Sequence, residues 1–260
     1  MNSHRIALVT GAGSGIGRAC AEKFAAQGLE VAAVAHSQDS AADAVASITS
    51  AGGVAEGFAA ELSDADAVAE LFQQVARRWD HLDVVVANAG INGVWAPLDE
   101  LTIEEWTQTI SVNLTGTFLT VKHALPLLRA AGGGSVVVTS SVNGTRMFSN
   151  AGASAYATSK AGQVAFAKMI AVELARDRIR VNVICPGAID TEIDDNTEQR
   201  NTEGLRLPVE FPKGQIPLTG MDPGRSEQVA DLVAFLASDA ASHITGTEVW
   251  IDGAQSLLAG

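Results

Sequence analysis

Aromatic residues and cysteines are scarce in this sequence. Only 5% of its 260 residues are aromatic, and Tyr156 is its single tyrosine. The two cysteines, Cys20 and Cys185, lie far apart, and neither belongs to a CxxC pair or a Cys/His cluster, so the sequence offers no metal site. We expect two buried free thiols rather than a disulfide, which suits a reducing compartment and predicts a cytoplasmic protein.

Basic residues are also in deficit. The chain has 17 Lys and Arg against 30 Asp and Glu, which gives a formal net charge of −13. An acidic surface repels phosphate backbones, and this argues against a nucleic-acid partner. No apolar run is long enough for a signal peptide or a membrane span, so we expect no association with a membrane.

Hydrophobic residues, in contrast, make up 47% of the chain and follow two alternating periods. Apolar runs typical of buried strands stand at 6–10, 31–35, 54–60, 82–87, 135–139, 179–185 and 248–251. Helical patterns separate them at 16–27, 40–50, 64–79, 103–129, 154–177 and 226–238. Strands that are apolar throughout are buried on both faces, and right-handed helical crossovers join them. The pattern predicts an α/β fold: a doubly wound parallel sheet flanked by helices, in a single domain of residues 1–260.

The stretch 188–225 interrupts this alternation. It is rich in Pro, Gly, Asp and Glu, and it follows the carboxyl end of a strand, where α/β folds bind ligands. A segment this long inside a compact domain usually has a functional reason. We therefore expect a mobile lid over the substrate, with a tolerated surface insertion as the alternative.

A glycine-rich turn joins the first strand to the first helix. It contains Thr10, Gly11, Gly13, Ser14, Gly15, Ile16 and Gly17. Glycines let the backbone turn sharply and approach a ligand closely, and the N–H groups of a helix start favour a pyrophosphate. The spacing matches neither G-x-G-x-x-G nor a P-loop. The turn thus predicts a phosphate site, and a purely structural turn is the alternative.

Tyr156 and Lys160 open a predicted helix and are four residues apart, so they share one face of it. A nearby ammonium lowers the pKa of a phenol from about 10, so Tyr156 could exchange a proton near neutrality. Ser141 follows a strand and could hold the substrate oxygen. Asn113 lies inside a helical pattern, where it could bend the helix and hold a water that links Lys160 to solvent. Considered alone, Tyr156 could instead be a surface residue, and Lys160 could be a solvated charge.

At this point the sequence resembles the short-chain dehydrogenase/reductase family over nearly its whole length. The resemblance is carried by the glycine turn, Asn88-Ala89-Gly90, Asn113, Ser141, Tyr156, Lys160, Pro186-Gly187, Thr191 and Trp250-Ile251-Asp252-Gly253. It implies a Rossmann-type fold and hydride transfer between NAD(P)(H) and a carbonyl or alcohol. The substrate class would be a small ketone, a 3-oxoacyl group or a sugar.

The resemblance also implies roles for individual residues. Asn113, Ser141, Tyr156 and Lys160 would form a catalytic tetrad, with Tyr156 as acid/base and Lys160 also on the nicotinamide ribose. Asn88 would hold the adenine-side helix and sheet, and Ile189 and Thr191 would contact the carboxamide. Members are commonly homotetramers or dimers packed through the helix that carries the Tyr, and the alanine-rich stretch 161–175 suits such packing.

Two positions depart from the family's pattern. Ser141 and Tyr156 are fifteen residues apart where the family usually shows thirteen, so a loop within 143–154 is two residues longer. Ser140 is for this reason a weaker candidate for the role of Ser141. Glu61 stands where an Asp usually meets the adenine, and Leu62 follows it.

The choice between NADP and NAD depends on the end of the second strand. NAD enzymes usually place an acid there, about 20 residues past the glycines, but this chain has Ala35. Without that carboxylate a 2′-phosphate is not repelled, and His36 and Ser37 could donate hydrogen bonds to it. Ser14, however, replaces the basic residue that many NADP members carry in the turn. We predict NADP, with NAD as the alternative.

The substrate pocket should draw side chains from 92–95, 143–148 and the lid at 188–219. Trp95, Met147 and Phe148 offer apolar surface there, and Arg146 could meet an anionic group or remain solvated. A different class of function is a catalytically inactive, NADP-sensing protein that binds a partner protein. Its mark would be the loss of Tyr156 or Lys160, and both are present.

Overall fold

A seven-stranded parallel sheet forms the centre of the protein in the computed structural model, which describes residues 4–193, 197–205 and 216–259. The strands are β1 (Ile6–Thr10), β2 (Glu30–Ala35), β3 (Val54–Ala59), β4 (Val84–Ala87), β6 (Gly134–Thr139), β7 (Ile179–Pro186) and β11 (Glu248–Ile251). Their order is β3-β2-β1-β4-β6-β7-β11, and every neighbouring pair is parallel. The order reverses between β1 and β4, the place where open α/β sheets bind ligands.

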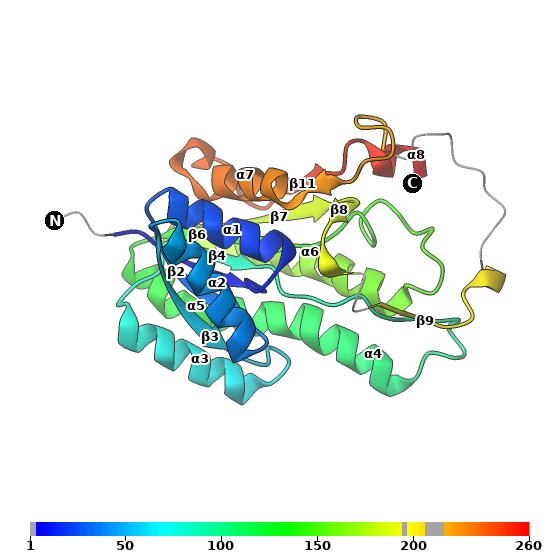
Figure 1. Cartoon of the computed structure of the whole chain (residues 1–260), viewed down its shortest axis with the longest axis horizontal. Coiled ribbons are helices and arrows are strands. Elements are labelled where there is room, and N and C mark those ends of the chain that lie inside the picture. Colours follow the sequence, from blue (N-terminus) through cyan, green and yellow to red (C-terminus); the bar gives the residue numbers. More distant parts are fainter. Residues whose placement is uncertain (1–3, 194–196, 206–215, 260) are drawn as a thin grey trace.

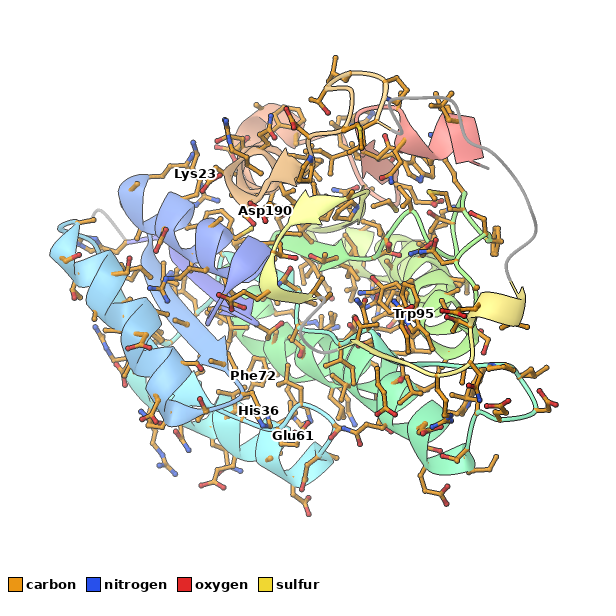
Figure 2. The ribbon with its side chains drawn as sticks, turned by 45° about the vertical axis from the view of Figure 1, so that its right-hand side comes forward. Lys23, His36, Glu61, Phe72, Trp95 and Asp190 are labelled. Carbon is orange, nitrogen blue, oxygen red and sulfur yellow. The ribbon has the colours of Figure 1, made fainter. Side chains whose placement is uncertain are left out.

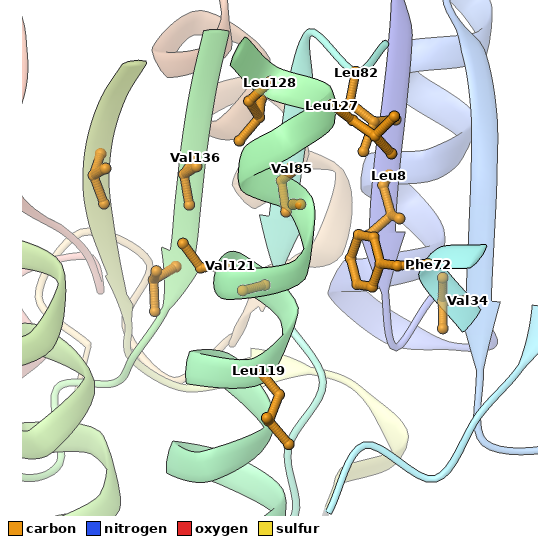
Figure 3. Packing of buried hydrophobic residues seen from close by; sticks show 14 of the residues in the cluster. Leu8, Val34, Phe72, Leu82, Val85, Leu119, Val121, Leu127, Leu128 and Val136 are labelled. Carbon is orange, nitrogen blue, oxygen red and sulfur yellow. The ribbon is translucent and has the colours of Figure 1, made fainter. Parts of the chain in front are cut away.

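Helices cover both faces of the sheet (Figure 1). One layer holds α1 (Gly15–Ala26), α2 (Gln38–Ser50) and α7 (Ser226–Ala237), and the other holds α3 (Ala65–Arg78), α5 (Gly116–Ala130) and α6 (Ser154–Leu174). Each layer has its own apolar core against the sheet. Figure 3 shows part of one core, where Leu127 and Leu128 of α5 pack toward Val85 and Leu8 of the strands. This arrangement confirms the predicted doubly wound α/β fold.

The local sequence explains where several helices begin. Thr102 caps α4 (Ile103–Ile110): its side chain accepts from Glu105 N, and the Glu105 carboxylate accepts from Thr102 N in return. The Asp64 carboxylate accepts from two backbone N–H groups at the start of α3. Such caps satisfy N–H groups that have no partner within the helix.

The long helical pattern at 103–129 is interrupted at one point. It consists of α4, a π-helical turn at Ser111–Thr115, and α5. Asn113 lies in that turn, at the position where the sequence predicted a bend. A π-helical turn inside an α-helix is rare and often marks a functional site.

The stretch 188–225, where the alternation of strands and helices stops, contains three short strands that the sequence did not predict. They are β8 (Ile189–Asp190), β9 (Thr197–Gln199) and β10 (Gly224–Arg225). Strand β8 pairs with β10, and β9 pairs with β5 (Gly93–Trp95), all in parallel. The parts of the predicted lid at 194–196 and 206–215 lie outside the described residues. The short helix α8 (Gln255–Ala259) was not predicted either.

Candidate active site

The glycine turn and the Tyr156/Lys160 pair line one cavity, at the carboxyl ends of the central strands. Its volume is about 200 Å³. Most of the predicted site residues line it: Gly11, Ser14, Gly15, Ile16, Asn88, Ala89, Gly90, Ser141, Tyr156, Lys160, Pro186, Gly187, Ile189 and Thr191. The structure thus brings together residues that lie far apart in the sequence, from Gly11 to Thr191.

Backbone geometry gives the glycine turn its shape. Gly11 and Gly15 adopt the left-handed region, with φ of +69° and +50°. At Gly17 an added Cβ would overlap the carbonyl oxygen of Gly11 and lie 2.6 Å from Asn88 Nδ2, so only glycine lets α1 start this close to the turn. Gly13 packs against Ser40 and Ala35, where a Cβ would be 3.0 Å from Ser40 Cβ. Gly13 and Gly17 shape the turn and do not line the cavity.

Thr10 and Asn88 join the ends of β1 and β4. Thr10 Oγ1 accepts hydrogen bonds from the N–H groups of Asn88 and Ala89 and donates to Val86 O. Asn88 Nδ2 donates to Thr10 O at 3.2 Å. Thr10 is almost fully buried, so its contribution is to fix the two strand ends that frame the cavity.

A second cavity of about 400 Å³ extends the first toward the end of β2. Ala35, His36, Glu61 and Leu62 are among its lining residues. His36 Nδ1 lies 3.3 Å from Glu61 Oε2, and Figure 2 shows the two side chains side by side. Burial acts to raise the pKa of Glu61, but hydrogen bonds from Ser63 outweigh it, so that pKa lies below its usual range. A carboxylate therefore lines this cavity from the segment that follows β3, and none does so from the end of β2.

Ser37 is turned toward its own helix. Its Oγ accepts from Ser40 N at 3.2 Å and donates to Ser40 Oγ at 3.0 Å, so Ser37 caps α2. It does not line the cavity beside His36. Sequence reasoning placed both residues at the strand end, but the side chain of Ser37 has this local partner.

Lys160 is buried beside Tyr156. Only 3% of it is exposed, its Nζ donates to Thr139 O at 3.0 Å, and that nitrogen lies 5.5 Å from the centroid of the Tyr156 ring. Burial lowers the pKa of Lys160 from 10.5 to about 8. The ammonium form therefore still predominates at pH 7, by about ten to one.

Asn113 is fully buried and is held by the loop that follows β4. Its Oδ1 accepts from Ile91 N at 2.8 Å, and its Nδ2 donates to Ile91 O and Ser159 Oγ. The amide therefore joins that loop to α6, next to Lys160. Its backbone carbonyl accepts from Gln163 Nε2 at 2.8 Å and Thr117 Oγ1 at 2.7 Å.

The two serines after β6 have different partners. Ser140 Oγ donates to Lys160 O at 2.9 Å and so holds α6 against the strand end. Ser141 Oγ accepts from Asn143 N at 3.1 Å, and Ser141 lines both the cavity that contains the glycine turn and a neighbouring cavity that contains Trp95. This geometry favours Ser141 over Ser140 as the group that meets a substrate oxygen.

The similarity of this chain to known proteins agrees with this geometry. A family profile described as Enoyl-(Acyl carrier protein) reductase matches residues 11–254. A solved structure described as a short-chain type dehydrogenase/reductase from Mycobacterium marinum is 34% identical, with a TM-score of 0.86 over 97% of this chain and 96% of that chain. The chain belongs to the short-chain dehydrogenase/reductase family. Proteins of this family are oxidoreductases, and so is this one.

Two further members show what this short-chain dehydrogenase/reductase is similar to. Cis-4-hydroxycyclohexanecarboxylate dehydrogenase of Sinomonas cyclohexanicum is 38% identical over 258 residues, which cover 98% of each chain. The crystal structure of a 3-ketoacyl-ACP reductase from Sinorhizobium meliloti 1021 is 51% identical, with a TM-score of 0.94 over 97% of this chain and 99% of that chain.

A third cavity in this dehydrogenase/reductase, of about 370 Å³, is lined by both Ser141 and Tyr156. Trp95 lines it, with its ring centroid 6.4 Å from that of Tyr156. Arg146 stacks instead on Trp250, with its guanidinium carbon 3.6 Å from the ring centroid, and it does not line this cavity. Phe148 is largely exposed.

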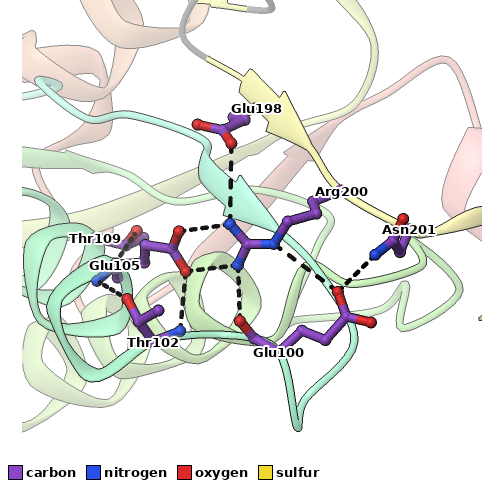
Figure 4. Close-up of polar contacts among 7 residues, drawn as sticks. All are labelled: Glu100, Thr102, Glu105, Thr109, Glu198, Arg200 and Asn201. Atoms are coloured by element: carbon purple, nitrogen blue, oxygen red, sulfur yellow. Dashed lines mark hydrogen bonds and ion pairs between the residues drawn. The ribbon is translucent and has the colours of Figure 1, made fainter.

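Sequence reasoning missed the contacts that hold the segment around β9. Arg200 donates to both carboxylate oxygens of Glu105 and to Glu100 O (Figure 4). Arg200 lowers the pKa of Glu105 to about 2. Asn201 Nδ2 adds a bond to the Glu100 carboxylate. These contacts join positions about a hundred residues apart, and no local sequence pattern predicts such a pairing.

Gln163 was also missed. It is fully buried, it holds the Asn113 carbonyl, and its own Oε1 has no hydrogen-bond partner. A glutamine one turn beyond Lys160 in an alanine-rich helix was the available signal.

Within the described residues, no cluster of His, Cys, Asp or Glu has a metal-binding arrangement, and no helix is long and apolar enough to cross a bilayer. Cys20 and Cys185 are free and buried, as predicted, and burial raises the pKa of their thiols to about 12 and about 11. Both are therefore protonated at neutral pH.

Proposed function

We propose that this protein interconverts a ketone and its secondary alcohol, with the hydride carried by NADP(H) or NAD(H). The observation that carries the proposal is the single cavity that contains the glycine turn, Ser141, Tyr156 and Lys160. One ligand in this cavity would be within reach of both the turn, as a phosphate-binding backbone, and Tyr156 and Lys160, as an acid/base pair.

Each side chain of the site has its own role in this reaction. The buried Lys160 ammonium favours the phenolate form of Tyr156, so the phenol can give or take the proton of the substrate oxygen. Ser141 Oγ holds that oxygen. Asn113 positions α6 through Ser159 and thereby sets where Lys160 lies. When bound, the nicotinamide supplies or accepts the hydride.

The residues present suit a dinucleotide. The left-handed Gly11 and Gly15 bring backbone N–H groups to the cavity, where a pyrophosphate would find them. Thr139 Oγ1 belongs to the same lining and is buried without a hydrogen-bond partner. Ala89, Gly90 and Lys160 would hold the ribose end, and Asn88 would hold the adenine-side helix and sheet. Pro186, Gly187, Ile189 and Thr191 would hold the nicotinamide.

For the cofactor we propose NADP, with NAD as the alternative. The end of β2 offers Ala35 in place of an acid, and the N-terminus of α2 and His36 adjoin it. The Glu61 carboxylate, 3.3 Å from His36, opposes a 2′-phosphate. We therefore expect the preference to be modest.

For the substrate we propose a ketone or secondary alcohol on a ring, by analogy with the hydroxycyclohexanecarboxylate dehydrogenase. A second candidate is a 3-oxoacyl thioester, which the 51% identity to the 3-ketoacyl-ACP reductase favours. A panel of cyclic ketones, sugars and 3-oxoacyl thioesters, assayed with each cofactor by nicotinamide absorbance, separates the two.

Replacing Tyr156 with Phe tests the mechanism. Loss of the hydroxyl removes the proton donor, so turnover should fall by about 100- to 10,000-fold. Cofactor binding, measured by nucleotide fluorescence, should remain. Full activity in Tyr156→Phe would contradict the mechanism, and cofactor binding without turnover of any substrate by the unaltered protein would favour the inactive, NADP-sensing alternative.

The protein is further proposed to be a homo-oligomer that packs through α5 and α6, in a reducing compartment such as the cytoplasm. Met169, Val172 and Phe118 on these helices are exposed, an unusual state for a helix surface that faces only water. The two free thiols suit the compartment. Light scattering on the wild-type chain and on Val172→Glu tests the packing, since a monomeric wild-type chain would contradict it.

The segment 188–225 keeps its proposed role as a substrate lid. Its described part contributes Ile189, Thr191 and Ile193 to the cavity that contains Tyr156. Protection of this segment from proteolysis by cofactor and substrate together is the expected result, and equal cleavage with and without ligands would contradict it.

A further inference from the structure

Arg200 follows β9 and contacts two other parts of the chain. Its backbone N–H donates to Trp95 O at 2.9 Å, on β5. Its guanidinium donates to both carboxylate oxygens of Glu105 on α4, at 2.8 and 2.9 Å, and to Glu100 O at 2.7 Å (Figure 4). One residue therefore ties the strand that carries Trp95 to α4.

The ion pair between Arg200 and Glu105 differs from an ordinary surface pair. It is bidentate, and the two side chains are 31% and 21% exposed, so water screens it less than a fully exposed pair. The carboxylates of Glu100 and Glu198 each lie 3.9 Å from the same guanidinium. Glu105 is itself fixed, because it accepts from Thr102 N at the start of α4. We therefore expect the Arg200 side chain to keep one position.

The peptide unit between Trp95 and Ala96 is held from both sides. A trans peptide points its carbonyl and its N–H in opposite directions. The carbonyl accepts from Arg200 N, and the N–H donates to Gly152 O at 3.2 Å, in the loop that leads into α6. The indole is fixed as well, because its Nε1 donates to Asn92 O at 3.2 Å. Arg200 thus supplies the hold on this peptide from the β9 side.

The indole of Trp95 packs on the phenol of Tyr156. Their ring centroids are 6.4 Å apart and their planes are inclined by 44°, an arrangement within the range of favourable aromatic pairs. Tyr156 is only 7% exposed, and both rings line the cavity that also contains Ser141. A shift of the indole would therefore change the packing of the phenol and the space beside it for a substrate.

We propose that Arg200 is a positioning residue: through the Trp95–Ala96 peptide it holds the Trp95 indole against Tyr156 and so keeps the phenol in place for proton transfer. This inference rests on the proposed function and extends it to a residue outside the site. Arg200 lines neither of the two cavities that contain Tyr156, so its effect passes through Trp95. The alternative is an ion pair that only stabilises the fold.

Arg200→Ala removes the guanidinium and keeps the N–H that bonds to Trp95. With the best ketone of the panel above, kcat should fall about tenfold, because the phenol is less well placed, while the dissociation constant of the cofactor stays unchanged. Arg200→Lys keeps the charge without the bidentate bond and should recover part of the loss. Arg78→Ala is the matched control and should keep the wild-type kcat. The Arg78 guanidinium also bonds two carboxylates, Glu56 and Glu30, but Glu30 begins β2, at the edge of the sheet opposite the site.

Combined variants test the route through Trp95. Trp95→Ala should lower kcat, and adding Arg200→Ala to it should cause little further loss, because no indole is left to hold in place. Losses that add fully in the double variant overturn the proposal, and so does a wild-type kcat in Arg200→Ala. The melting temperature of each variant checks its fold. Where Arg200→Ala does not fold, Arg200→Lys takes its place in the same comparison.

A measurement without turnover separates this proposal from the proposed function. Tyr156 is the single tyrosine of the chain, so fluorine NMR of protein labelled with meta-fluorotyrosine reports this ring alone. Arg200→Ala should shift its resonance, Arg78→Ala should not, and Arg200→Ala should cause no further shift in the Trp95→Ala protein. If no ketone is turned over but the resonance moves in this way, the proposed function fails and the hold of Arg200 on Tyr156 stands. Turnover by a wild-type protein whose resonance Arg200→Ala leaves unmoved overturns the role of Arg200 alone.

Discussion

The glycine turn and the loop after Ser141 line two cavities that both contain Tyr156, and they differ in how much side chains add to their backbone contacts. In the turn, backbone atoms approach so closely that Gly17 has no room for a Cβ. The loop has one equally close approach, because a Cβ on Gly144 would overlap the carbonyl oxygen of Ala157. In the loop, however, side chains add further contacts: Trp250 Nε1 donates to Thr145 Oγ1, and Arg146 stacks on the Trp250 ring. Contacts made by side chains can be changed by substitution, whereas the close approaches at Gly17 and Gly144 cannot.

Gly17→Ala should have the largest effect, on the cofactor side. Its Cβ would overlap the Gly11 carbonyl oxygen, so either the turn or α1 must move. We expect a loss of about 3 kcal/mol in the free energy of unfolding and loss of cofactor binding. Urea unfolding and nucleotide fluorescence measure the two. Gly204→Ala, where a Cβ meets nothing within 4 Å, is the control and should match the wild type.

Lys160 lies between the two parts, and its burial predicts a pH dependence. Its pKa of about 8 in the folded protein is below the 10.5 of an exposed lysine, so the unfolded chain binds more protons between these values. The cost of burying the charge is therefore full below pH 8, and stability should rise as the pH increases from about 8 to 10.5. Turnover should fall as the pH rises through about 8, because the Lys160 ammonium beside Tyr156 is lost.

Lys160→Met measures the free-energy cost of burying the Lys160 charge. At pH 7 it should raise the free energy of unfolding by at most about 3 kcal/mol while abolishing turnover, and the gain should vanish near pH 10.5. Urea unfolding at both pH values provides the measurement. A variant less stable than the wild type at pH 7 would show that the Thr139 hydrogen bond outweighs the cost of burial.

Arg146→Ala should disturb only the substrate side. Loss of the stack on Trp250 should cost about 1 kcal/mol of stability and raise KM for the ketone a few-fold. The dissociation constant of the cofactor, measured separately, should not change. Arg77→Ala, on the outer face of α3, serves as the control. Equal losses of cofactor and substrate affinity in Arg146→Ala would mean that the two sides are not independent.

Glu61→Gln should have the smallest effect. Removing the carboxylate beside His36 relieves repulsion of a 2′-phosphate, so the ratio of NADP to NAD affinity should rise a few-fold. Titration of each cofactor against wild type and variant gives the ratio. A fall in this ratio would place Glu61 away from the phosphate and on another part of the nucleotide.

The parts that the sequence predicted are those with local causes. Strands such as β1 and β4 are fully buried apolar runs, and the glycine turn and the Tyr156/Lys160 pair follow from spacing alone. The short strands β5 and β9 exist only because segments a hundred residues apart pair with each other. The same is true of the Arg200–Glu105 ion pair and of the contact between His36 and Glu61, which neighbouring strands bring together. Each residue was visible in the sequence, but its partner was not.

The pairing of β5 with β9 ties Trp95, which lines the cavity beside Tyr156, to the segment around β9. Trp95 lies opposite Gln199, and the N–H group of Arg200 donates to Trp95 O at 2.9 Å. This segment therefore cannot separate from β5 without breaking the pairing. The Arg200 amide should exchange its hydrogen for deuterium only during such separations, and its exchange rate would report how often they occur.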